Sequence, residues 1–227
     1  KEPCSYSNVP EQITFVLTSS NRFDLLQRTM DSFLALNTYP VARYIISEDG
    51  NNKKCYDKIK NRYGDIAEVI LQPVRLGCSL HLDTLLGMVK TPWVFTCEDD
   101  WLFESNPNFM SDALCVMKAV PDIKQVWIRH PADHSHPLLP AIRIGNVPIQ
   151  KVTKGYQGKW NGFSFNPALR RMSDYRRMFP NGFQEFGDEI ICAQHTETFH
   201  NGYLAYSLVN SVVKHIGWNR HTDDFKV

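Results

Sequence analysis

The first hundred residues alternate between short apolar runs and amphipathic segments. The runs are rich in β-branched and aromatic residues and occupy residues 12–18, 42–47, 67–72 and 93–98. Apolar residues recur with helical spacing in 21–36, 53–64 and 79–90, and Asn21 or Asp24 is expected to cap the first of these helices. Strands alternating with helices at short intervals are typical of βαβ units. The sequence therefore predicts an α/β fold with a mostly parallel sheet.

The pattern becomes less regular after about residue 120. We expect one more strand at 125–130, and long loops with edge strands in the Pro- and His-rich segment 131–150. A strand leading into a helix is expected at 160–179, then a helix over 185–202 that Gly202 ends, and a last strand and tail over 212–222. With no repeat or low-complexity linker, residues 1–227 are interpreted as one domain. Its halves are a nucleotide-binding half, about 1–120, and a half that shapes a second pocket, about 121–227.

Charge and hydropathy exclude several classes of protein. The formal net charge is only +1, so there is no broad electrostatic case for binding nucleic acid or an anionic membrane. No apolar run approaches the roughly 20 residues that a membrane-spanning helix needs. No signal peptide opens the chain, but it begins at Lys1 rather than Met, so upstream signals could be missing.

The six cysteines form no CxxC pair, which argues against a thiolate zinc site. Cys97 and Cys115 lie in apolar segments and are interpreted as small core residues. Free thiols are favoured over a disulfide framework, although a secreted or Golgi-lumen enzyme would change that expectation.

Three adjacent acids, Glu98, Asp99 and Asp100, end the apolar run of "TPWVFTCEDDWLF" (91–103). Neighbouring carboxylates repel each other and are costly to remove from water, so a positive group is expected beside them. In open α/β sheets, ligands bind at the carboxyl ends of the strands. Mg²⁺ and Mn²⁺ take carboxylate oxygens, often together with substrate phosphates. A solvated acidic turn is the alternative, and the apolar flanks favour the metal–diphosphate interpretation.

An ordered set of motifs resembles one enzyme family. "ITFVLTSSNR", then "SEDG" after the second strand, then "EDDWLF" after the fourth, look like a GT-A fold nucleotide-sugar glycosyltransferase of the family-two-like inverting type. The chain is also similar to compact glycosyltransferases of large algal viruses. A further similarity is to N-acetylglucosaminyltransferases with an "EDD" triplet before a Pro-x-Phe helix start, although here a longer insert precedes Pro107. The resemblance implies a GT-A fold with a mixed, mostly parallel central sheet flanked by helices, in which a Rossmann-like nucleotide-binding half precedes an acceptor half.

The resemblance also implies a set of donor-binding residues. Side chains at the end of the first strand would lie beside the nucleotide, and Glu48 or Asp49 would hydrogen-bond its base or ribose. Arg75 would face the diphosphate and Asp83 would lie near the donor. Plain alternatives are a turn at 48–52, a surface arginine and a solvated helix face. Together with Glu98 and Asp99, which would bind sugar or ribose hydroxyls or reach the metal through water, the donor set is Thr18, Ser19, Ser20, Arg22, Glu48, Asp49, Arg75, Asp83, Glu98 and Asp99.

Two residues are expected to touch a cation directly. Asp100 is the more direct ligand of the triplet, and His215 in "VVKHIGWN" resembles the histidine of an "HxG" ending that supplies a further ligand in similar enzymes. A neutral imidazole suits Mn²⁺ better than Mg²⁺, so Mn²⁺ is the expected cofactor and Mg²⁺ the alternative. A core histidine is the plain interpretation of His215.

The resemblance implies a catalytic base at the start of a late helix. In "GFQEFGDEIIC" the acidic pair is Asp188–Glu189, with Glu189 the expected base and Asp188 the alternative. The plain interpretation of the pair is charge complementarity at a helix N-terminus. For the acceptor, aromatic rings can pack on sugars, so Trp160, Asn161 and Phe163 are candidates, with core packing as the alternative. The histidines of 129–136 suggest a loop over the active site rather than a second metal site.

The resulting hypothesis is a metal-dependent glycosyltransferase. It would move a sugar from a nucleoside-diphosphate sugar, with UDP the expected nucleotide, to a hydroxyl of a glycan or glycoconjugate, with inversion. The rival is a catalytically silent sugar- or nucleotide-binding module on the same fold. A nucleotidyltransferase is disfavoured because "TSSNRFD" is not a Gly-rich basic loop, and no tight His/Asp ligand set indicates a hydrolase. The sequence leaves the location unknown: a soluble enzyme of the cytoplasm, including a viral one, and a catalytic fragment from the Golgi lumen both fit.

Overall fold

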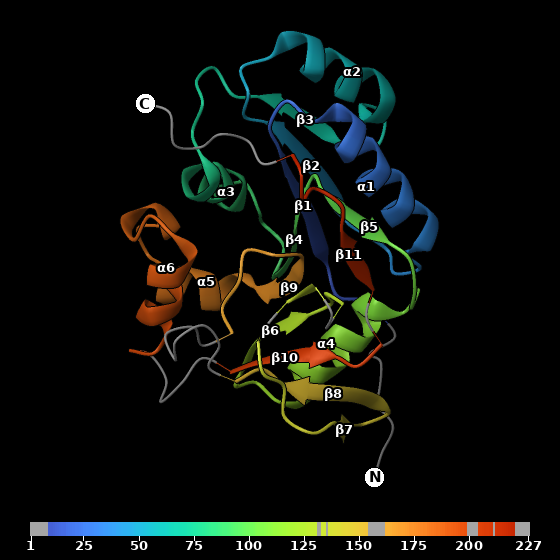
Figure 1. Ribbon diagram of the computed structural model, residues 1–227, viewed down its shortest axis with the longest axis vertical. Coiled ribbons are helices and arrows are strands. Elements are labelled where there is room, and N and C mark those ends of the chain that lie inside the picture. The colour runs from blue at the N-terminus through green and yellow to red at the C-terminus, as the bar shows by residue number, and fades with distance from the viewer. Residues whose placement is uncertain are drawn as a thin grey trace.

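The computed structural model describes residues 9–130, 133–134, 136–153, 162–198, 204–210 and 212–220. Within these residues, nine strands form one sheet in the order β3-β2-β1-β4-β9-β6-β10-β8-β7, and β11 pairs with β5 in a separate small sheet (Figure 1). The strands are β1 (Ile13–Ser19), β2 (Arg43–Glu48), β3 (Glu68–Leu71), β4 (Trp93–Glu98), β5 (Trp101–Phe103), β6 (Ile123–Trp127), β7 (Ile142–Ile144), β8 (Val147–Lys151), β9 (Ala168–Arg171), β10 (Leu204–Leu208) and β11 (Val213–His215).

The sheet is mixed but mostly parallel. Strands β3, β2, β1 and β4 run parallel, as the alternating first half of the chain predicts. Strand β9 runs antiparallel between β4 and β6, and β10 is parallel to β6. The hairpin β7–β8 closes one edge, which confirms the edge strands expected in the Pro-rich segment. The predicted α/β fold class is therefore confirmed.

Helices cover both faces of the sheet. They are α1 (Phe23–Leu36), α2 (Lys53–Tyr63), α3 (Cys78–Gly87), α4 (Phe109–Ala119), α5 (Met172–Met178) and α6 (Glu189–Thr196), with a short 3-10 turn, η3 (Phe183–Glu185). Buried side chains of α1, α2 and α4 share one hydrophobic cluster, and those of α3, α5 and α6 share the other.

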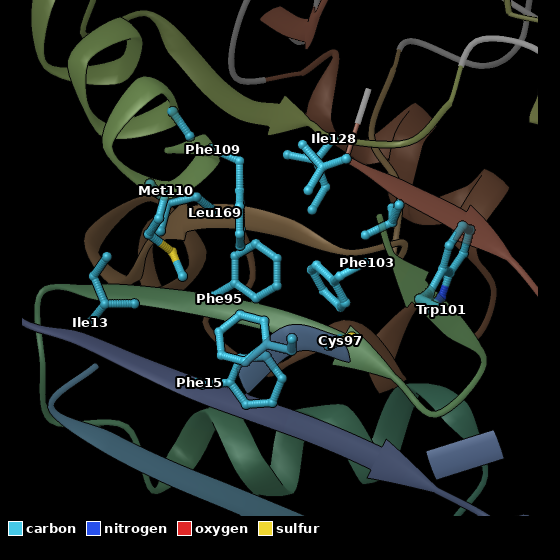
Figure 2. Packing of buried hydrophobic residues seen from close by; sticks show 14 of the residues in the cluster. Ile13, Phe15, Phe95, Cys97, Trp101, Phe103, Phe109, Met110, Ile128 and Leu169 are labelled. Carbon is cyan, nitrogen blue, oxygen red and sulfur yellow. The ribbon is translucent and has the colours of Figure 1, made fainter. Parts of the chain in front are cut away.

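The alternation of side chains along β1 explains why there are two clusters. Phe15 and Leu17 point to the first cluster, whereas Val16 points to the second, because successive residues of a strand face opposite sides. In the first cluster the Phe15 and Phe95 rings stack with centroids 5.7 Å apart, and Phe103 lies beside them (Figure 2). Such aromatic packing adds to the hydrophobic stabilisation of the sheet.

Strand register brings polar residues to one edge. Thr18 of β1 pairs with Glu98 of β4, and Ser19 pairs with Glu48 of β2. Because parallel strands end on the same side of the sheet, the residues that follow β1, β2 and β4 converge there.

Some local predictions were wrong. Helix α1 begins after Arg22, and neither Asn21 nor Asp24 caps it with a side chain. Asn21 instead lies with positive φ in the turn after β1. Strands β5 and β10 were not predicted: β5 has only three residues, and the helix expected over 185–202 ends at Thr196.

The described cysteines include both free thiols and a disulfide-bonded residue. Cys55, Cys78, Cys97 and Cys192 are free, as expected. Cys97 is buried and confirms its core role. Cys115 is disulfide-bonded, which corrects the expectation of a free thiol at that position.

Thr29 provides a test of how α1 supports the acidic turn. Its hydroxyl donates to the Asp99 carbonyl at 2.9 Å and accepts from the Trp101 amide at 3.0 Å, and the residue is fully buried. Thr29→Val keeps the shape but leaves both backbone groups without this partner. We expect the free energy of unfolding in urea to fall by about 2–4 kcal/mol. Thr29→Ser keeps the hydroxyl and should cost only about 1 kcal/mol for the lost methyl group. Equal losses in the two variants would show that the hydroxyl is not needed.

Candidate active site

A cavity of about 290 Å³ opens at the carboxyl ends of β1, β2 and β4. It is called the acidic cavity here, after the three carboxylates that follow β4. Among the predicted site residues, those that line it are Thr18, Ser19, Ser20, Arg22, Asp49, Glu98, Asp99, Asp100 and His215. Segments far apart in the sequence, including the C-terminal β11, thus meet in one place.

Arg22 supplies the positive charge that the buried acids require. Its guanidinium forms an ion pair with Asp99 through Nη2, and its Nε donates to the other oxygen of the same carboxylate at 3.2 Å. Its Nη1 donates to Asp100 Oδ2 at 3.0 Å. Asp99 is fully buried and Asp100 is 6% exposed, so one arginine pairs with two carboxylates that water barely reaches and offsets part of their charge.

The pKa values of the three acids are not shifted in the same direction. Burial, with the nearby Asp100 charge, raises the pKa of Glu98 to about 8. Burial also raises the pKa of Asp99 to about 7, although Arg22 opposes this. For Asp100, burial is outweighed by the hydrogen bond from His215 and the charge of Arg22, so its pKa is lowered. Asp100 is therefore the member that stays ionised most readily.

His215 lies directly beside Asp100. Its Nε2 is 3.2 Å from Asp100 Oδ2, and its ring packs at 4.9 Å from the Trp101 ring. The pairing of β11 with β5 produces this contact, because His215 is opposite Trp101 in the register. The backbone adds a further tie, since the Ile216 amide donates to the Asp100 carbonyl at 2.9 Å.

The Asp100–His215 pair fits the first coordination sphere of a divalent cation. Ligands of one ion lie about 2.1 Å from it, so two ligand atoms 3.2 Å apart can both reach the same ion. His215 Nδ1 is buried without a partner among the described residues, so protein groups do not engage both ring nitrogens. A carboxylate with an imidazole suits Mn²⁺.

The pair does not form a complete metal site. In the part of the chain that the structure describes, no group of three or more His, Cys, Asp or Glu side chains is arranged to hold an ion. Remaining ligands would have to come from water and a bound phosphate, as is usual for Mg²⁺-type sites. The histidines after β6 do not supply a second site either, since His134 and His136 pack edge-on against Trp127.

The two acids after β2 hold the loops around the acidic cavity. Glu48 is fully buried and accepts hydrogen bonds from Ser19 Oγ, Asn21 N, Gly50 N and Cys55 Sγ. It supports the wall and does not line the cavity. Asp49 does line it, while its two oxygens accept from the amides of Leu76 at 2.7 Å and Gly77 at 2.9 Å.

Arg75, Asp83 and Phe163 do not line the acidic cavity. Arg75 is exposed and is not part of the lining. Asp83 accepts from the Tyr175 hydroxyl and from the amides of Phe183 and Gln184, each at 2.8 Å, so it fastens α3 to η3. Phe163 is 1% exposed and packs with Phe165, Phe179 and Phe183, which favours core packing over a sugar-binding wall. Trp160 and Asn161 lie outside the described residues.

The two acids at the start of α6 have different surroundings. Asp188 is exposed and caps the helix, because its side chain accepts from the Ile191 amide at 2.8 Å. Glu189 is half-buried, and its Oε1 accepts from the Phe165 amide at 2.7 Å. Burial raises the Glu189 pKa against the opposing effect of hydrogen bonds from Ser164 and Phe165. Helix capping thus accounts for Asp188 but not for Glu189.

Sequence reasoning missed seven of the residues that line the acidic cavity, which are Gly77, Cys78, His81, Trp101, Arg129, Asn166 and Trp218. The Arg129 guanidinium lies over the Trp101 ring at 5.1 Å and the Trp218 ring at 5.8 Å, and its Nε is buried without a partner among the described residues. Trp218 is 54% exposed and its ring lies 4.5 Å from the His215 ring. A tryptophan directly after the "HxG"-like ending is a signal that could have been used.

Comparison with known proteins identifies the family. The family model described as Glycosyl transferase family 2 matches residues 14–180. The chain belongs to glycosyl transferase family 2. The match includes β2, β4 and the acidic triplet but ends before β11, and the predicted glycosyltransferase is confirmed at the level of the family. A search of curated proteins finds no match.

Solved structures with the same fold include two glycosyltransferases. The mannosyltransferase PcManGT from Pyrobaculum calidifontis, in complex with GDP-Man and Mn²⁺, is 15% identical with a TM-score of 0.63, over 94% of this chain and 59% of that one. S. aureus TarS 1–349 is 12% identical with a TM-score of 0.62, over 91% of this chain and 60% of that one. The same TarS fragment is also known with UDP-GlcNAc, at 11% identity and a TM-score of 0.61, over 89% of this chain and 57% of that one.

These similarities confirm the predicted GT-A fold. The chain spans about 60% of the length of these solved proteins, so its donor, acceptor and metal are matters for proposal. In the described residues, no helix is long and apolar enough to cross a membrane.

Gly217 allows a test of the Asp100–His215 contact. A Cβ at this position would lie 2.3 Å from Asp100 Oδ2, closer than real atoms approach. Gly217→Ala should therefore push the Asp100 carboxylate away from His215, lower the free energy of unfolding by about 1–3 kcal/mol and weaken Mn²⁺ binding measured by calorimetry.

Gly87→Ala is the matched control. A Cβ at Gly87, the last residue of α3, meets nothing within 4 Å. This control should be neutral or stabilising by up to about 1 kcal/mol and should leave Mn²⁺ binding unchanged. If Gly217→Ala behaves in the same way, the close packing of Gly217 on Asp100 is unimportant.

Proposed function

We propose that this chain transfers a sugar from a nucleoside-diphosphate sugar to a hydroxyl group of a glycan or glycoconjugate, with inversion at the anomeric carbon. UDP is the first nucleotide to test, and GDP is the second because a structural neighbour was solved with GDP-Man. The observation that carries the proposal is the acidic cavity, in which Asp100, His215 and two arginines meet at the carboxyl ends of the strands.

The donor would bind in the acidic cavity. Its nucleoside would lie along the ends of β1 and β2, beside Thr18, Ser20 and Asp49, which line the wall there. Glu98 would hydrogen-bond sugar or ribose hydroxyls, and its raised pKa lets it act as donor or acceptor near neutral pH.

Asp100 and His215 would hold Mn²⁺ or Mg²⁺, and when bound the cation would neutralise charge on the leaving diphosphate. Arg129 would contribute a second positive charge next to the leaving diphosphate. Its guanidinium, held between two tryptophan rings, has an unpartnered buried Nε to offer a phosphate oxygen.

Glu189 would act as the general base. The acceptor hydroxyl attacks the anomeric carbon and gives its proton to the Glu189 carboxylate. The new glycosidic bond forms as the bond from the anomeric carbon to the diphosphate oxygen breaks, and the nucleoside diphosphate leaves. The upward shift of the Glu189 pKa by burial suits this role, because a stronger base takes the proton more readily.

Nucleotide binding gives the first test. UDP or GDP in the presence of Mn²⁺ should raise the melting temperature, because a ligand at 100 times its Kd stabilises the native state by about 2.7 kcal/mol. For a chain of this size that corresponds to roughly 5–10 °C. Asp100→Asn should lose the Mn²⁺-dependent part of the shift.

Asp112→Asn is the control for this test, since Asp112 lies in the first turn of α4, does not line the acidic cavity and accepts from Asn106 Nδ2 at 3.2 Å. No shift of wild-type protein with any nucleoside diphosphate would contradict the donor assignment. A metal-dependent shift that survives in Asp100→Asn would contradict the ligand assignment alone.

The two acids at the start of α6 can be separated by mutation. Glu189→Gln should keep nucleotide binding but reduce transfer at least 100-fold, within the range expected for loss of a general base. Asp188→Asn should keep most transfer and cost about 1 kcal/mol or less of stability through a weaker helix cap. Transfer is measured with radiolabelled donors against a panel of glycans. Loss of transfer in Asp188→Asn but not in Glu189→Gln would exchange the two roles.

A further inference from the structure

Arg170 is a buried arginine that holds the backbone next to Glu189. It lies on β9 and is 5% exposed. Its Nε donates to Thr96 Oγ1 at 3.3 Å, its Nη2 donates to the Ser164 carbonyl, and its guanidinium lies 5.4 Å from the Phe163 ring. These contacts fix the guanidinium in one place beside the Ser164 backbone.

The Ser164 backbone connects Arg170 to the proposed base. The Ser164 carbonyl accepts from Arg170 and also from Gln125 Nε2 at 2.8 Å, and the Ser164 amide donates to Gln125 Oε1 at 3.1 Å. The next amide, of Phe165, donates to Glu189 Oε1, and the Ser164 side chain hydrogen-bonds the same carboxylate. Gln125 on β6 and Ser164, in the segment before β9, are both fully buried and thus align the donors that Glu189 receives.

Charge completes the connection. The charges that act on Glu189 come from three elements: Glu98 at the end of β4, Arg129 after β6 and Arg170 on β9. Cys192 on α6 lies close enough to interact with Glu189. The Cys192 thiol is neutral, because burial raises its pKa to about 12. Arg170 and Arg129 favour the ionised Glu189, whereas Glu98, when charged, opposes it. Arg129 lines the acidic cavity, so substrate would compete for it; Arg170 does not line that cavity.

We propose that Arg170, together with Gln125, is a positioning residue for Glu189: it holds the Ser164–Phe165 backbone against the carboxylate. This inference rests on the proposed role of Glu189 as base. It adds a reason why a carboxylate that burial would protonate can still accept a proton at neutral pH.

The test measures the titration of Glu189 directly. The carboxyl carbon of Glu189 is followed by NMR in full-length protein labelled with ¹³C-glutamate, and Glu189→Gln assigns the signal. In Arg170→Gln the titration midpoint should move to higher pH, because a positive charge that favours the ionised form is lost. Arg170→Lys keeps the charge and should return the midpoint towards that of wild type.

Arg171→Gln is the matched control from the same strand. Arg171 pairs with Asp174 at 3.0 Å and donates to the Ile123 carbonyl at 2.8 Å, so its loss should affect stability but not the Glu189 midpoint. If Arg170→Gln does not fold, Thr96→Val serves instead, because it removes the acceptor of Arg170 Nε and should shift the midpoint in the same direction.

Kinetics provide the second measurement. Once a donor that the enzyme transfers has been identified, the pH dependence of kcat can be measured. Arg170→Gln should move its acid limb to higher pH and leave the KM for the donor unchanged. A variant that is less stable but titrates Glu189 as wild type does would overturn the inference and leave Arg170 a packing residue. Full transfer by Glu189→Gln would instead overturn the base assignment, and with it any role of Arg170 in catalysis.

Discussion

The burial of Asp99 against Arg22 is the interaction on which the acidic cavity depends. Asp99 is fully buried, and both of its oxygens accept from the Arg22 side chain while the Ser20 amide donates to one of them. Without that guanidinium, three adjacent carboxylates at the end of a core strand would repel one another in a medium of low dielectric constant. Arg22 lies in the turn that follows β1, and Asp99 lies in the turn that follows β4. The turn after β1 therefore supplies the positive charge for the turn after β4. Because β1 and β4 are paired in parallel, the turns that follow them lie next to each other.

The acids around the cavity make different contacts and therefore have different roles. Both oxygens of Asp99 accept from Arg22, and one of them also accepts from the Ser20 amide, so Asp99 has a structural role in the cavity wall. Asp100 shares one oxygen between Arg22 and His215, and its lowered pKa keeps it charged, so it is the member suited to an incoming cation. Glu98 and Asp49 follow their strands in the same way, yet Asp49 uses its oxygens to hold the loop at Leu76 and Gly77. Equivalent positions at strand ends therefore serve different purposes according to what their carboxylates already bind.

Sequence reasoning succeeded where periodicity or an ordered set of motifs carried the information. Alternating strands and helices predicted the first half of the sheet, and the acids after β4 with His215 after β11 pointed to one site although they are separated by more than a hundred residues. It failed where tertiary contacts decide the role of a side chain. Nothing local indicates that Asp83 fastens η3, or that Phe163 is enclosed by Phe179 and Phe183. Arg129 was missed for the same reason, because its position between Trp101 and Trp218 depends on three separate segments.

Charge balance across the cavity connects its two sides. On the donor side, Arg22 already compensates Asp99 and part of Asp100, so an incoming cation would meet a site of reduced negative charge and would need phosphate oxygens to complete its ligands. On the acceptor side, Glu189 is surrounded by Arg129 and Arg170 and opposed by Glu98. A donor diphosphate that engaged Arg129 would withdraw one of the charges that favour ionised Glu189 and so strengthen it as a base. Under the proposed roles, donor binding and the basicity of Glu189 would be linked through the Arg129 guanidinium, and proton removal would be favoured after the donor has bound.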